Sequence, residues 1–369
     1  MRVIFAGGGT GGHLYPGLAI ARALVRARPD VEPFFVGAQR GIEKHVLPQS
    51  EFPYVLLDLH PLHRRAAWKN WRTLVSAVME WRKIGQLVRE HRPALVVGTG
   101  GYASGLMLEY ARRKHIPIVQ QVGDSYPGLT ARRYARDCAE IYLTFPEAAR
   151  LLRVSDRSKL VDTGAPIDPP TSMSLSRATA RAKWGFPRAG GHVLLVYGGS
   201  QGSEAINRAV AGWINLGLPD DLYVIWGTGR STFAEFASYE SARVRVRDYL
   251  APISDAYAAS DLAVARAGSM TTSELFAWKI PAILVPLPTA AAQHQTTNAA
   301  TLEHAGAAIH LPQTQLTGPR LHELIGSLLD DPPRLQALAE GAARRARPRA
   351  AETIAEHILA IIDRSARQT

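Results

Sequence analysis

Arg2-Val-Ile-Phe-Ala-Gly-Gly-Gly-Thr-Gly-Gly-His13 is an apolar strand that runs into a glycine-rich turn, and a helical pattern follows from Leu14. Half a chain later, His192-Val-Leu-Leu-Val-Tyr-Gly-Gly-Ser-Gln-Gly202 repeats this arrangement ahead of a second helical pattern. Glycine lets backbone amides approach a ligand closely, and a helix N-terminus favours negative charge, so each turn predicts an anion-binding site. The repetition predicts two doubly wound, Rossmann-like α/β domains that face each other across a cleft.

The rest of the chain keeps the same rhythm of short apolar runs and helical patterns, which is typical of parallel sheets covered by helices. We expect strands at residues 2–6, 33–37, 54–57, 94–98, 117–120, 141–145, 192–197, 222–226, 243–246, 261–265, 282–286 and 307–310. Three prolines in the segment Ala165-Pro-Ile-Asp-Pro-Pro-Thr-Ser172 indicate a linker. The sequence therefore predicts a first domain over residues 1–165, a second over 166–349, and a last helix over 350–369 that packs back on the first domain.

The overall composition limits the class of protein. A chain of 369 residues is long for one domain, and 46% hydrophobic with 20% charged residues fits a folded soluble protein. The one cysteine, Cys138, excludes an intramolecular disulfide, fits a reducing cytoplasm, and is interpreted as a buried apolar side chain rather than a catalytic thiol. No apolar run approaches the ~18 residues that span a bilayer, so we expect a soluble protein.

The net charge of +11 is concentrated in one stretch. Residues 60–93 contain eight lysines and arginines against two glutamates, and a basic surface favours nucleic acid, an anionic membrane or a phosphorylated substrate as partner. Tryptophans recur in this stretch at helical spacing, which fits either a core helix or an interfacial patch. No nucleic-acid-binding module is recognisable, so nucleic acid is not expected as a partner. We favour a membrane-surface patch formed by Arg64, Arg65, Trp68, Lys69, Trp71, Arg72 and Trp81.

The first glycine-rich turn also satisfies the dinucleotide pattern G-x-G-x-x-G through Gly7, Gly9 and Gly12. The second expected strand, however, ends in Gly37-Ala-Gln-Arg40, without the acid that holds a dinucleotide ribose. A nicotinamide or flavin enzyme is therefore disfavoured. No D-x-D motif and no histidine or cysteine cluster with metal spacing is present in the sequence. We expect no cofactor and no metal, and assign phosphate neutralisation to amides and helix ends.

His13 lies at the start of the first expected helix. A histidine there is either a polar cap or a general base, because neutral imidazole accepts a proton near pH 7. Gly98-Thr-Gly-Gly-Tyr-Ala-Ser-Gly105 is a third glycine-rich turn after an apolar strand. The carboxyl ends of parallel strands meet at one edge of a sheet, so this turn is expected at the same edge as His13.

In the second half, Ala263-Val-Ala-Arg-Ala-Gly-Ser-Met-Thr-Thr-Ser-Glu274 is again a strand, a small-residue turn and a helix start. Residues 271–273 offer hydroxyls and amides to phosphate oxygens, and Glu274 is placed to accept hydrogen bonds from ribose hydroxyls. The alternative interpretation is a capped helix with an acid in its first turn. The polar stretch Gln293-His-Gln-Thr-Thr-Asn298 suits sugar hydroxyls or a solvated loop.

Seven motifs recur in a fixed order: Gly8-Gly-Thr-Gly-Gly-His13, Gly98-Thr-Gly-Gly-Tyr-Ala-Ser-Gly105, Pro127-Gly-Leu-Thr130, Phe145-Pro-Glu-Ala-Ala149, Gly198-Gly-Ser-Gln-Gly202, Arg266-Ala-Gly-Ser-Met-Thr-Thr-Ser-Glu274, and His294-Gln295 with Asn298-Ala299. This ordered set resembles the MurG family, and the likeness spans roughly residues 2 to 310. That family is bacterial and has the two-domain GT-B fold. The resemblance implies an inverting transfer of N-acetylglucosamine from UDP-N-acetylglucosamine to lipid I, the muramyl-pentapeptide on undecaprenyl diphosphate, which gives lipid II.

The resemblance also implies roles for individual positions. It places the substrate diphosphates beside Thr10, Gly11 and Gly12, the ribose on Glu274 and the transferred sugar on Gln295. It implies a peripheral enzyme at the cytoplasmic face of the cell membrane, with the membrane patch in the N-terminal domain. The remaining positions that it places around the uridine diphosphate are Ser200, Leu250, Ser269, Met270, Thr271, Thr272 and Ser273.

Three positions depart from the family pattern. Gln121-Val-Gly-Asp124 stands where the family usually has His-Glu-Gln-Asn, Asp168 replaces a donor-contacting arginine, and Gln293 replaces an aspartate. We expect His13 to be the general base, with Asp124 as the second candidate, and expect Asp124 and Asp168 to lie at the substrate. A related UDP-sugar transferase that acts on another lipid or small-molecule acceptor is the alternative function.

Overall fold

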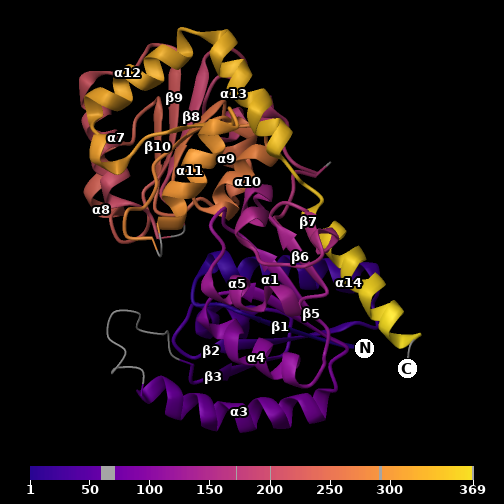
Figure 1. Cartoon of the computed structure of the whole chain (residues 1–369). Coiled ribbons are helices and arrows are strands. Elements are labelled where there is room, and N and C mark those ends of the chain that lie inside the picture. The colour runs from indigo at the N-terminus through magenta and orange to yellow at the C-terminus, as the bar shows by residue number, and fades with distance from the viewer. Residues whose placement is uncertain (60–70, 172, 200, 291–292, 368–369) are drawn as a thin grey trace. The chain divides into compact units, whose positions relative to one another are not determined.

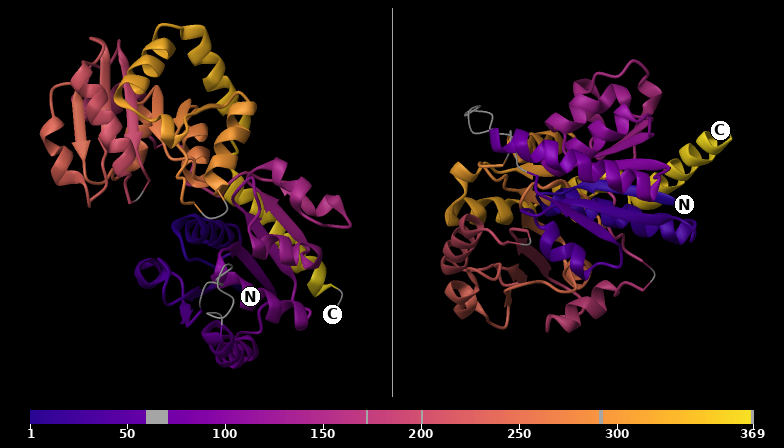
Figure 2. Two further views of the ribbon diagram at one scale, coloured as in Figure 1. Left: turned by 60° about the vertical axis from the view of Figure 1, so that its left-hand side comes forward. Right: turned by 90° about the horizontal axis from the view of Figure 1, so that it is seen from below.

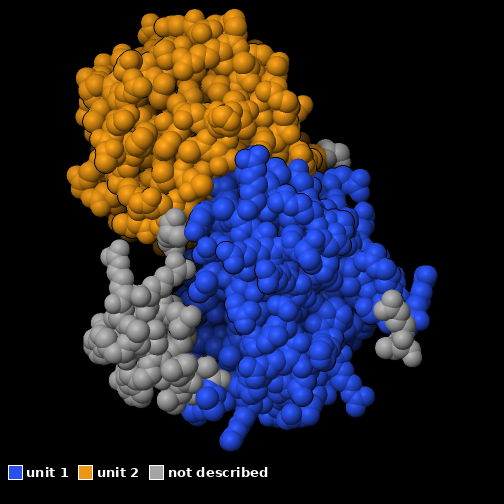
Figure 3. Space-filling view, viewed as in Figure 1, with its two compact units in different colours: residues 1–168, 349–369 blue, residues 169–348 orange. Residues whose placement is uncertain are grey.

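The structure is a computed structural model that describes residues 1–59, 71–171, 173–199, 201–290 and 293–367. The chain divides into two compact units: unit 1 comprises residues 1–168 and 349–369, and unit 2 comprises residues 169–348 (Figure 3). Each unit is built on a parallel sheet with helices on both faces (Figure 1). The predicted α/β class, with two doubly wound domains, is confirmed.

The described part of unit 1 contains a seven-stranded sheet in the order β3-β2-β1-β4-β5-β6-β7, in which all neighbours are parallel. Its strands are β1 (Arg2–Gly7), β2 (Glu32–Ala38), β3 (Tyr54–Leu57), β4 (Leu95–Gly100), β5 (Ile118–Val122), β6 (Glu140–Leu143) and β7 (Leu160–Asp162). The chain builds outward from β1 to β3 and then crosses back to β4. The strand order therefore reverses between β1 and β4, and such a switch point is where open α/β sheets bind ligands.

The helices of unit 1 are α1 (Gly11–Ala27), α2 (Glu43–Val46), α3 (Trp71–His91), α4 (Tyr102–Arg113), α5 (Leu129–Tyr134) and α14 (Ala350–Ala366). Helices α3, α4 and α5 cover one face of the sheet, with Ile84, Met107 and Ala131 in that core. Helices α1 and α14 cover the other face, with Leu18 and Ile358 in its core. Because both faces are covered, the strands are apolar throughout rather than alternating in polarity.

The C-terminal helix α14 belongs to unit 1 although it follows unit 2 in sequence. Its apolar face, which includes Ile354, Ile358 and Ile361, is buried against α1, and both views in Figure 2 show it beside elements of unit 1. The Arg28 guanidinium donates two hydrogen bonds to the Asp363 carboxylate, at 2.8 and 2.7 Å. The regularly spaced isoleucines of α14 therefore pack within the core of unit 1.

The described part of unit 2 contains a six-stranded parallel sheet in the order β10-β9-β8-β11-β12-β13. Its strands are β8 (His192–Tyr197), β9 (Leu222–Gly227), β10 (Val244–Arg247), β11 (Leu262–Ala265), β12 (Ala282–Leu284) and β13 (Ala308–His310). The order reverses between β8 and β11, so the second glycine-rich turn, which follows β8, also lies at a switch point.

The helices of unit 2 are α6 (Arg177–Lys183), α7 (Glu204–Leu216), α8 (Phe233–Phe236), α9 (Ile253–Ala259), α10 (Ser269–Ala277), α11 (His294–His304), α12 (Gly318–Leu329) and α13 (Pro332–Arg345). Helices α7 and α12 cover one face of the sheet, with Trp213 and Leu321 in the core. Tyr197, the last residue of β8, meets the ring of Tyr257 on α9. Helix α9 therefore covers part of the opposite face.

All twelve expected strands form, with ends within two residues of their predicted positions. β7, a three-residue edge strand without a fully buried side chain, was not predicted. Cys138 is buried, as predicted, and burial raises the pKa of its thiol to about 12. No helix among the described residues is long and apolar enough to cross a membrane.

Candidate active site

The first glycine-rich turn carries the chain from β1 to α1 in a conformation that glycine favours. Gly8 has φ +150° and Gly9 has φ +89°, and Thr10 is the N-cap of α1 without a side-chain capping hydrogen bond. Amide groups at the N-terminus of a 17-residue helix thus lie at the switch point of the sheet.

A buried carboxylate fixes this turn from behind. Glu43, at the start of α2, is fully buried, and its Oε1 accepts hydrogen bonds from the amides of Gly9 at 2.9 Å and Ala38 at 3.1 Å. A Cβ on Gly8 would lie 1.8 Å from Oε1, and a Cβ on Gly41 would lie 1.9 Å from Oε2. A side chain at either position would therefore displace the Glu43 carboxylate. Glu43 was not predicted as a site residue, because nothing in a single sequence marks this acid as buried.

His13 lies against the third glycine-rich turn, as predicted from the strand order. Its ring atom Cδ2 would be 2.6 Å from a Cβ on Gly100, and its Nδ1 3.3 Å from a Cβ on Gly101. Both glycines have positive φ, +100° and +76°. Thr10 Oγ1 and His13 Nδ1 lie 3.1 Å apart, so the threonine hydroxyl holds one ring nitrogen and the glycines make room for the ring.

Other predicted motifs converge on the same third turn. The Gly8 amide donates to the Gly100 carbonyl at 3.3 Å, and the Thr130 hydroxyl donates to the Gly101 carbonyl, also at 3.3 Å. Ser104 donates to that carbonyl at 2.9 Å. The structure therefore brings the motifs of residues 8–13, 98–105 and 127–130 together at one edge of the first sheet.

Two acids of interest lie in unit 1. Asp124 is half-buried and follows β5, which is separated from β1 by β4 alone, so its position is at the same sheet edge as His13. Asp168 is exposed at the end of the unit. The pKa of Arg22 is raised, mainly by its hydrogen bond to Glu51, and the Asp168 carboxylate adds a smaller contribution. Asp168 is thus within electrostatic reach of a cation.

In unit 2, the second glycine-rich turn leads into α7. Gly199 and Gly202 have φ +88° and +75°, and a Cβ on Gly202 would lie 2.3 Å from the Thr228 carbonyl oxygen. Ser203 is the N-cap of α7 and accepts a hydrogen bond from the Ile206 amide at 3.4 Å. Ser200, expected at the diphosphate, lies outside the described residues.

The N-terminus of α10 lies beside this turn, since β8 and β11 are neighbours in the sheet. Its N-cap is Gly268, with no side-chain capping bond. The hydroxyl of Thr272 donates to the carbonyls of Gly268 and Ser269, each at 3.1 Å. Because Thr272 is also buried, its hydroxyl bonds to the backbone of its own helix rather than facing solvent. Met270, Thr271 and Ser273 are partly exposed.

Glu274 follows in the same helix and is half-buried. Its Oε2 accepts a hydrogen bond from the Tyr257 hydroxyl at 2.8 Å. Leu250, expected beside the nucleotide, is buried, and its side chain lies 2.9 Å from the place of a Cβ on Gly227. A ligand would therefore meet the backbone of Leu250 rather than its side chain.

Gln295 and Asn298 lie at the start of α11. Gln295 Oε1 accepts a hydrogen bond from the Leu287 amide at 2.9 Å. Asn298 is fully buried and donates to the Ala267 carbonyl at 3.2 Å, which ties α11 to the turn before α10. Both side chains therefore have structural contacts, and Gln295 is partly exposed whereas Asn298 is buried.

Arg266, directly after β11, connects these loops and was not singled out in the sequence. Its guanidinium donates to the carbonyls of Val285 and Pro286 at 3.2 and 3.1 Å. It also donates to Gln313 Oε1 at 2.8 Å and to Ser203 Oγ at 2.6 Å. Burial lowers the pKa of Arg266 to about 10. These partners are all neutral, so a buried cation is held among the loops at the carboxyl edge of the second sheet.

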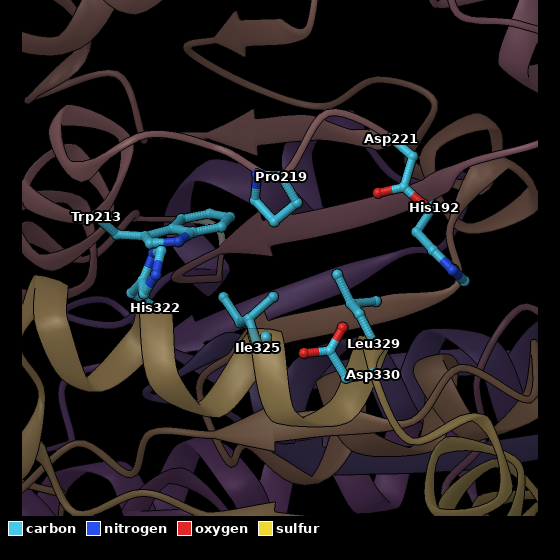
Figure 4. A pocket seen from close by; sticks show the side chains of 9 residues that line it. His192, Trp213, Pro219, Asp221, His322, Ile325, Leu329 and Asp330 are labelled. Carbon is cyan, nitrogen blue, oxygen red and sulfur yellow. The ribbon is translucent and has the colours of Figure 1, made fainter.

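A cavity of about 240 Å³ elsewhere in unit 2 is lined by His192, Trp213, Asp221 and Asp330, among others (Figure 4). His192 begins β8 and Asp221 precedes β9, so the cavity lies at the amino ends of the strands. Ligands of open α/β sheets bind at the carboxyl ends. This cavity is therefore separate from the glycine-rich turns, and we do not assign it to the nucleotide.

The expected membrane patch is only partly described. Arg64, Arg65, Trp68 and Lys69 lie outside the described residues, and for Trp71 and Arg72 only the helical backbone of α3 is described. Trp81 is half-buried, with its ring 4.9 Å from that of Tyr110, so it packs toward the core. Two apolar side chains of α3 are instead strongly exposed, Val78 at 65% and Met79 at 62%.

Among the described residues, no three histidine, cysteine, aspartate or glutamate side chains are grouped so that they could hold a metal ion.

Comparison with known proteins gives the family. Residues 3–143 match the glycosyltransferase family 28 N-terminal domain, and residues 193–354 match its C-terminal domain. A protein of Salinibacter ruber is 40% identical over 98% of this chain and 97% of its own length. A protein of Moorella thermoacetica is 37% identical over 98% of this chain and 100% of its own length. Both are named UDP-N-acetylglucosamine--N-acetylmuramyl-(pentapeptide) pyrophosphoryl-undecaprenol N-acetylglucosamine transferase. The chain belongs to the MurG family.

Solved structures agree with this assignment. The crystal structure of Acinetobacter baumannii MurG matches with a TM-score of 0.74 and 25% identity, over 97% of this chain and 99% of that chain. The two parallel-sheet units are those of GT-B glycosyltransferases. The resemblance to the MurG family that the ordered motifs indicated is therefore confirmed, along both halves of the chain.

Proposed function

We propose that this chain is a hexosyltransferase that moves N-acetylglucosamine from UDP-N-acetylglucosamine to the undecaprenyl-diphosphate-linked muramyl-pentapeptide, lipid I, and so makes lipid II for peptidoglycan. The observation that carries the proposal is the match along almost the full length of both chains, at 40% identity, to a transferase named for this donor and this acceptor. The fold alone would not select the reaction, because one fold hosts many functions.

Unit 2 is the proposed donor site. The amides at the N-terminus of α10 and those after β8 are the groups that suit a diphosphate, with contacts from Ser269, Met270, Thr271 and Ser273. The buried Arg266 cation, whose guanidinium donates to the neutral groups of Val285, Pro286, Gln313 and Ser203, adds positive potential. Glu274 accepts the ribose hydroxyls, and Gln295 contacts the transferred sugar. We further assign Ser200, Thr272 and the Leu250 backbone to this site.

Unit 1 is the proposed site of proton transfer. The acceptor hydroxyl attacks the anomeric carbon, its proton passes to His13, and the bond to the departing UDP breaks, which inverts the anomeric centre. The Thr10 hydroxyl beside His13 Nδ1 holds the ring for this step. Thr10, Gly11 and Gly12 present helix N-terminal amides to a substrate diphosphate. Asp124, at the same sheet edge, is the second candidate for the base.

Phosphate neutralisation is assigned to amides, helix ends and Arg266 rather than to a metal or other cofactor. A helix N-terminus contributes about 0.3–2 kcal/mol to the binding of an anion. In the proposed donor site, the N-termini of α7 and α10 and the Arg266 guanidinium therefore act together. Asp168 stands where the family has an arginine, so the positive charge of the proposed donor site is assigned to Arg266 and the helix ends.

We propose that the enzyme works as a peripheral protein on the cytoplasmic face of the cell membrane. The support is the basic stretch of residues 60–93 together with the exposed Val78 and Met79 on α3. An apolar insertion combined with cations is the arrangement that binds anionic bilayers. The enzyme would then meet its lipid-linked acceptor at the membrane surface.

A specific observation keeps a second acceptor open. Gln121-Val-Gly-Asp124 differs from the family at a position on the acceptor side, so a related transferase acting on another lipid or small molecule is the alternative. The test is turnover of radiolabelled UDP-N-acetylglucosamine with a soluble lipid I analogue beside a panel of other acceptors. We expect label on the lipid I analogue at the highest rate. Faster transfer to another acceptor would select the alternative.

A further inference from the structure

Behind Glu274 lies a pair of tyrosines that the proposed chemistry does not use. The Tyr257 hydroxyl donates to Glu274 Oε2 at 2.8 Å, and the Tyr197 and Tyr257 hydroxyl oxygens are 3.1 Å apart. Tyr197 is 5% exposed and Tyr257 is 3% exposed. The three residues come from β8, α9 and α10, so α9 contacts the carboxylate directly and β8 is connected to it through Tyr257.

The number of protons on each hydroxyl decides which group donates in each hydrogen bond. A phenol has one proton, and that of Tyr257 is donated to Glu274. The hydroxyl of Tyr197 must therefore donate to the Tyr257 oxygen. Burial, the largest cause, raises the pKa values of both phenols far above neutrality, so both stay protonated, and the order Tyr197 to Tyr257 to Glu274 is fixed.

Packing holds the rings that carry these hydroxyls. The rings of Tyr197 and Tyr257 meet edge to face, with centroids 6.2 Å apart and an angle of 64°. The Trp278 ring lies 6.1 Å from that of Tyr257 on the same helix–sheet face. With their rings confined in a close-packed interior, the phenols cannot follow the carboxylate if it rotates. Oε2 is therefore anchored, and the orientation of the whole carboxylate is set.

We infer that Tyr257 and Tyr197 are positioning residues that orient Glu274 toward the ribose and so determine how strongly the donor site distinguishes a nucleotide with ribose hydroxyls from one without them. This inference rests on the proposed role of Glu274. A chain of hydrogen bonds polarises each member in a low-dielectric interior, so the Tyr197 hydroxyl acts on Glu274 through Tyr257. Removing the Tyr197 hydroxyl should therefore weaken the discrimination for ribose hydroxyls, as removing the Tyr257 hydroxyl does, but to a smaller extent.

The experiment is a calorimetric measurement of two ligands, UDP and its 2′,3′-dideoxy analogue, on the full-length protein. The quantity of interest is the ratio of the two dissociation constants, which reports the ribose hydroxyls alone. The variants are Glu274→Gln, Tyr257→Phe and Tyr197→Phe. The phenylalanine variants keep the buried rings and remove only the hydroxyls. Tyr239→Phe removes a hydroxyl elsewhere in unit 2, where it accepts from Asn215, and is the matched control.

We expect the parent to bind UDP more tightly than the dideoxy analogue and Glu274→Gln to reduce that ratio. Tyr257→Phe is expected to reduce it by about three- to tenfold, with little change in affinity for the dideoxy analogue, and Tyr197→Phe by less. Tyr239→Phe should leave it unchanged. A loss of packing alone would weaken both ligands equally and leave the ratio as in the parent.

Two results would overturn the inference, and they are distinguishable. If Glu274→Gln reduces the ratio while both Tyr257→Phe and Tyr197→Phe keep the parental value, the tyrosines do not position the carboxylate, although Glu274 still binds the ribose. If Glu274→Gln itself keeps the parental ratio, the ribose role of Glu274 in the proposed function is wrong, and the positioning role falls with it. Should Tyr257→Phe fold poorly, Tyr197→Phe alone decides the first case.

Discussion

The Glu43 carboxylate accepts a hydrogen bond from the Gly9 amide at 2.9 Å, although 34 positions separate the two residues. The same oxygen accepts from the Ala38 amide at the end of β2. The first glycine-rich turn is therefore held by the neighbouring strand and its loop rather than by its own residues. Because this amide is occupied by Glu43, we assign the proposed anion-binding role to the amides that follow, at Thr10, Gly11 and Gly12.

Replacing Glu43 should disturb the turn and spare the nucleotide site. Glu43→Ala leaves the buried Ala38 amide and the partly buried Gly9 amide without this acceptor. A fully buried amide without an acceptor costs about 1–3 kcal/mol, and we expect a lower free energy of unfolding and at least tenfold lower turnover. Glu43→Gln keeps an acceptor oxygen and should retain more activity than the alanine variant. Turnover and UDP affinity are measured together. Parental turnover in Glu43→Ala would show that the carboxylate does not shape the site.

Removing the proposed base should lower turnover far more than donor affinity. His13→Ala is expected to lose about 10²–10⁴ in turnover number, with UDP affinity unchanged, because the imidazole acts on the acceptor hydroxyl. Asp124→Asn is the comparison, since it removes the second candidate while it keeps the size of the side chain. If His13→Ala stays within about threefold of the parent and Asp124→Asn does not, the role of base passes to Asp124.

Gly100, which makes room for the His13 ring, allows a steric test with a matched control. Gly100→Ala places a Cβ 2.6 Å from the His13 ring at a residue with φ +100°, so we expect about 1–2 kcal/mol of backbone strain. A displaced base should cost up to about 10²-fold in turnover. Gly105→Ala is the control, because nothing lies within 4 Å of its Cβ. The idea is contradicted if both variants have the same turnover.

The sequence carried most of the fold and only part of the site. Runs of buried apolar residues predicted the strands because parallel strands are covered on both faces, whereas β7 has three half-exposed or exposed residues and leaves no such signal. His13 and its glycine-rich neighbours were predictable, since strand ends meet at one sheet edge. Glu43 was not, because its partners lie on other elements and the burial of an acid is invisible in sequence. Tyr197 and Tyr257 belong to apolar patterns, and their shared contact to Glu274 exists only in the folded unit.

Membrane binding should depend partly on salt. Each cation near an anionic surface contributes about 1 kcal/mol at most, and screening reduces this within a Debye length. A variant with four basic residues of the stretch 60–93 changed to glutamine should sediment less with anionic vesicles and keep its UDP affinity. Parental sedimentation would mean that the stretch is a solvated face. The four residues are Arg64, Arg65, Lys69 and Arg72.

A charge-matched control distinguishes a local patch from net charge. Four exposed cations of unit 2 changed to glutamine remove the same formal charge from another part of the chain. We expect this control to sediment as the parent does. Equal loss in both quadruple variants would assign the binding to overall charge and not to the stretch of residues 60–93. The control positions are Arg188, Lys279, Arg334 and Arg344.

The central claim, transfer of N-acetylglucosamine to lipid I with inversion, is tested most directly by nuclear magnetic resonance of the product. The purified protein is incubated with UDP-N-acetylglucosamine and a soluble lipid I analogue, and the anomeric proton coupling of the new sugar is measured as UDP is released. We expect one β-linked disaccharide for each UDP, from an α-linked donor. An α-linked product, or UDP release that yields only free sugar and no disaccharide, would contradict inverting transfer to lipid I.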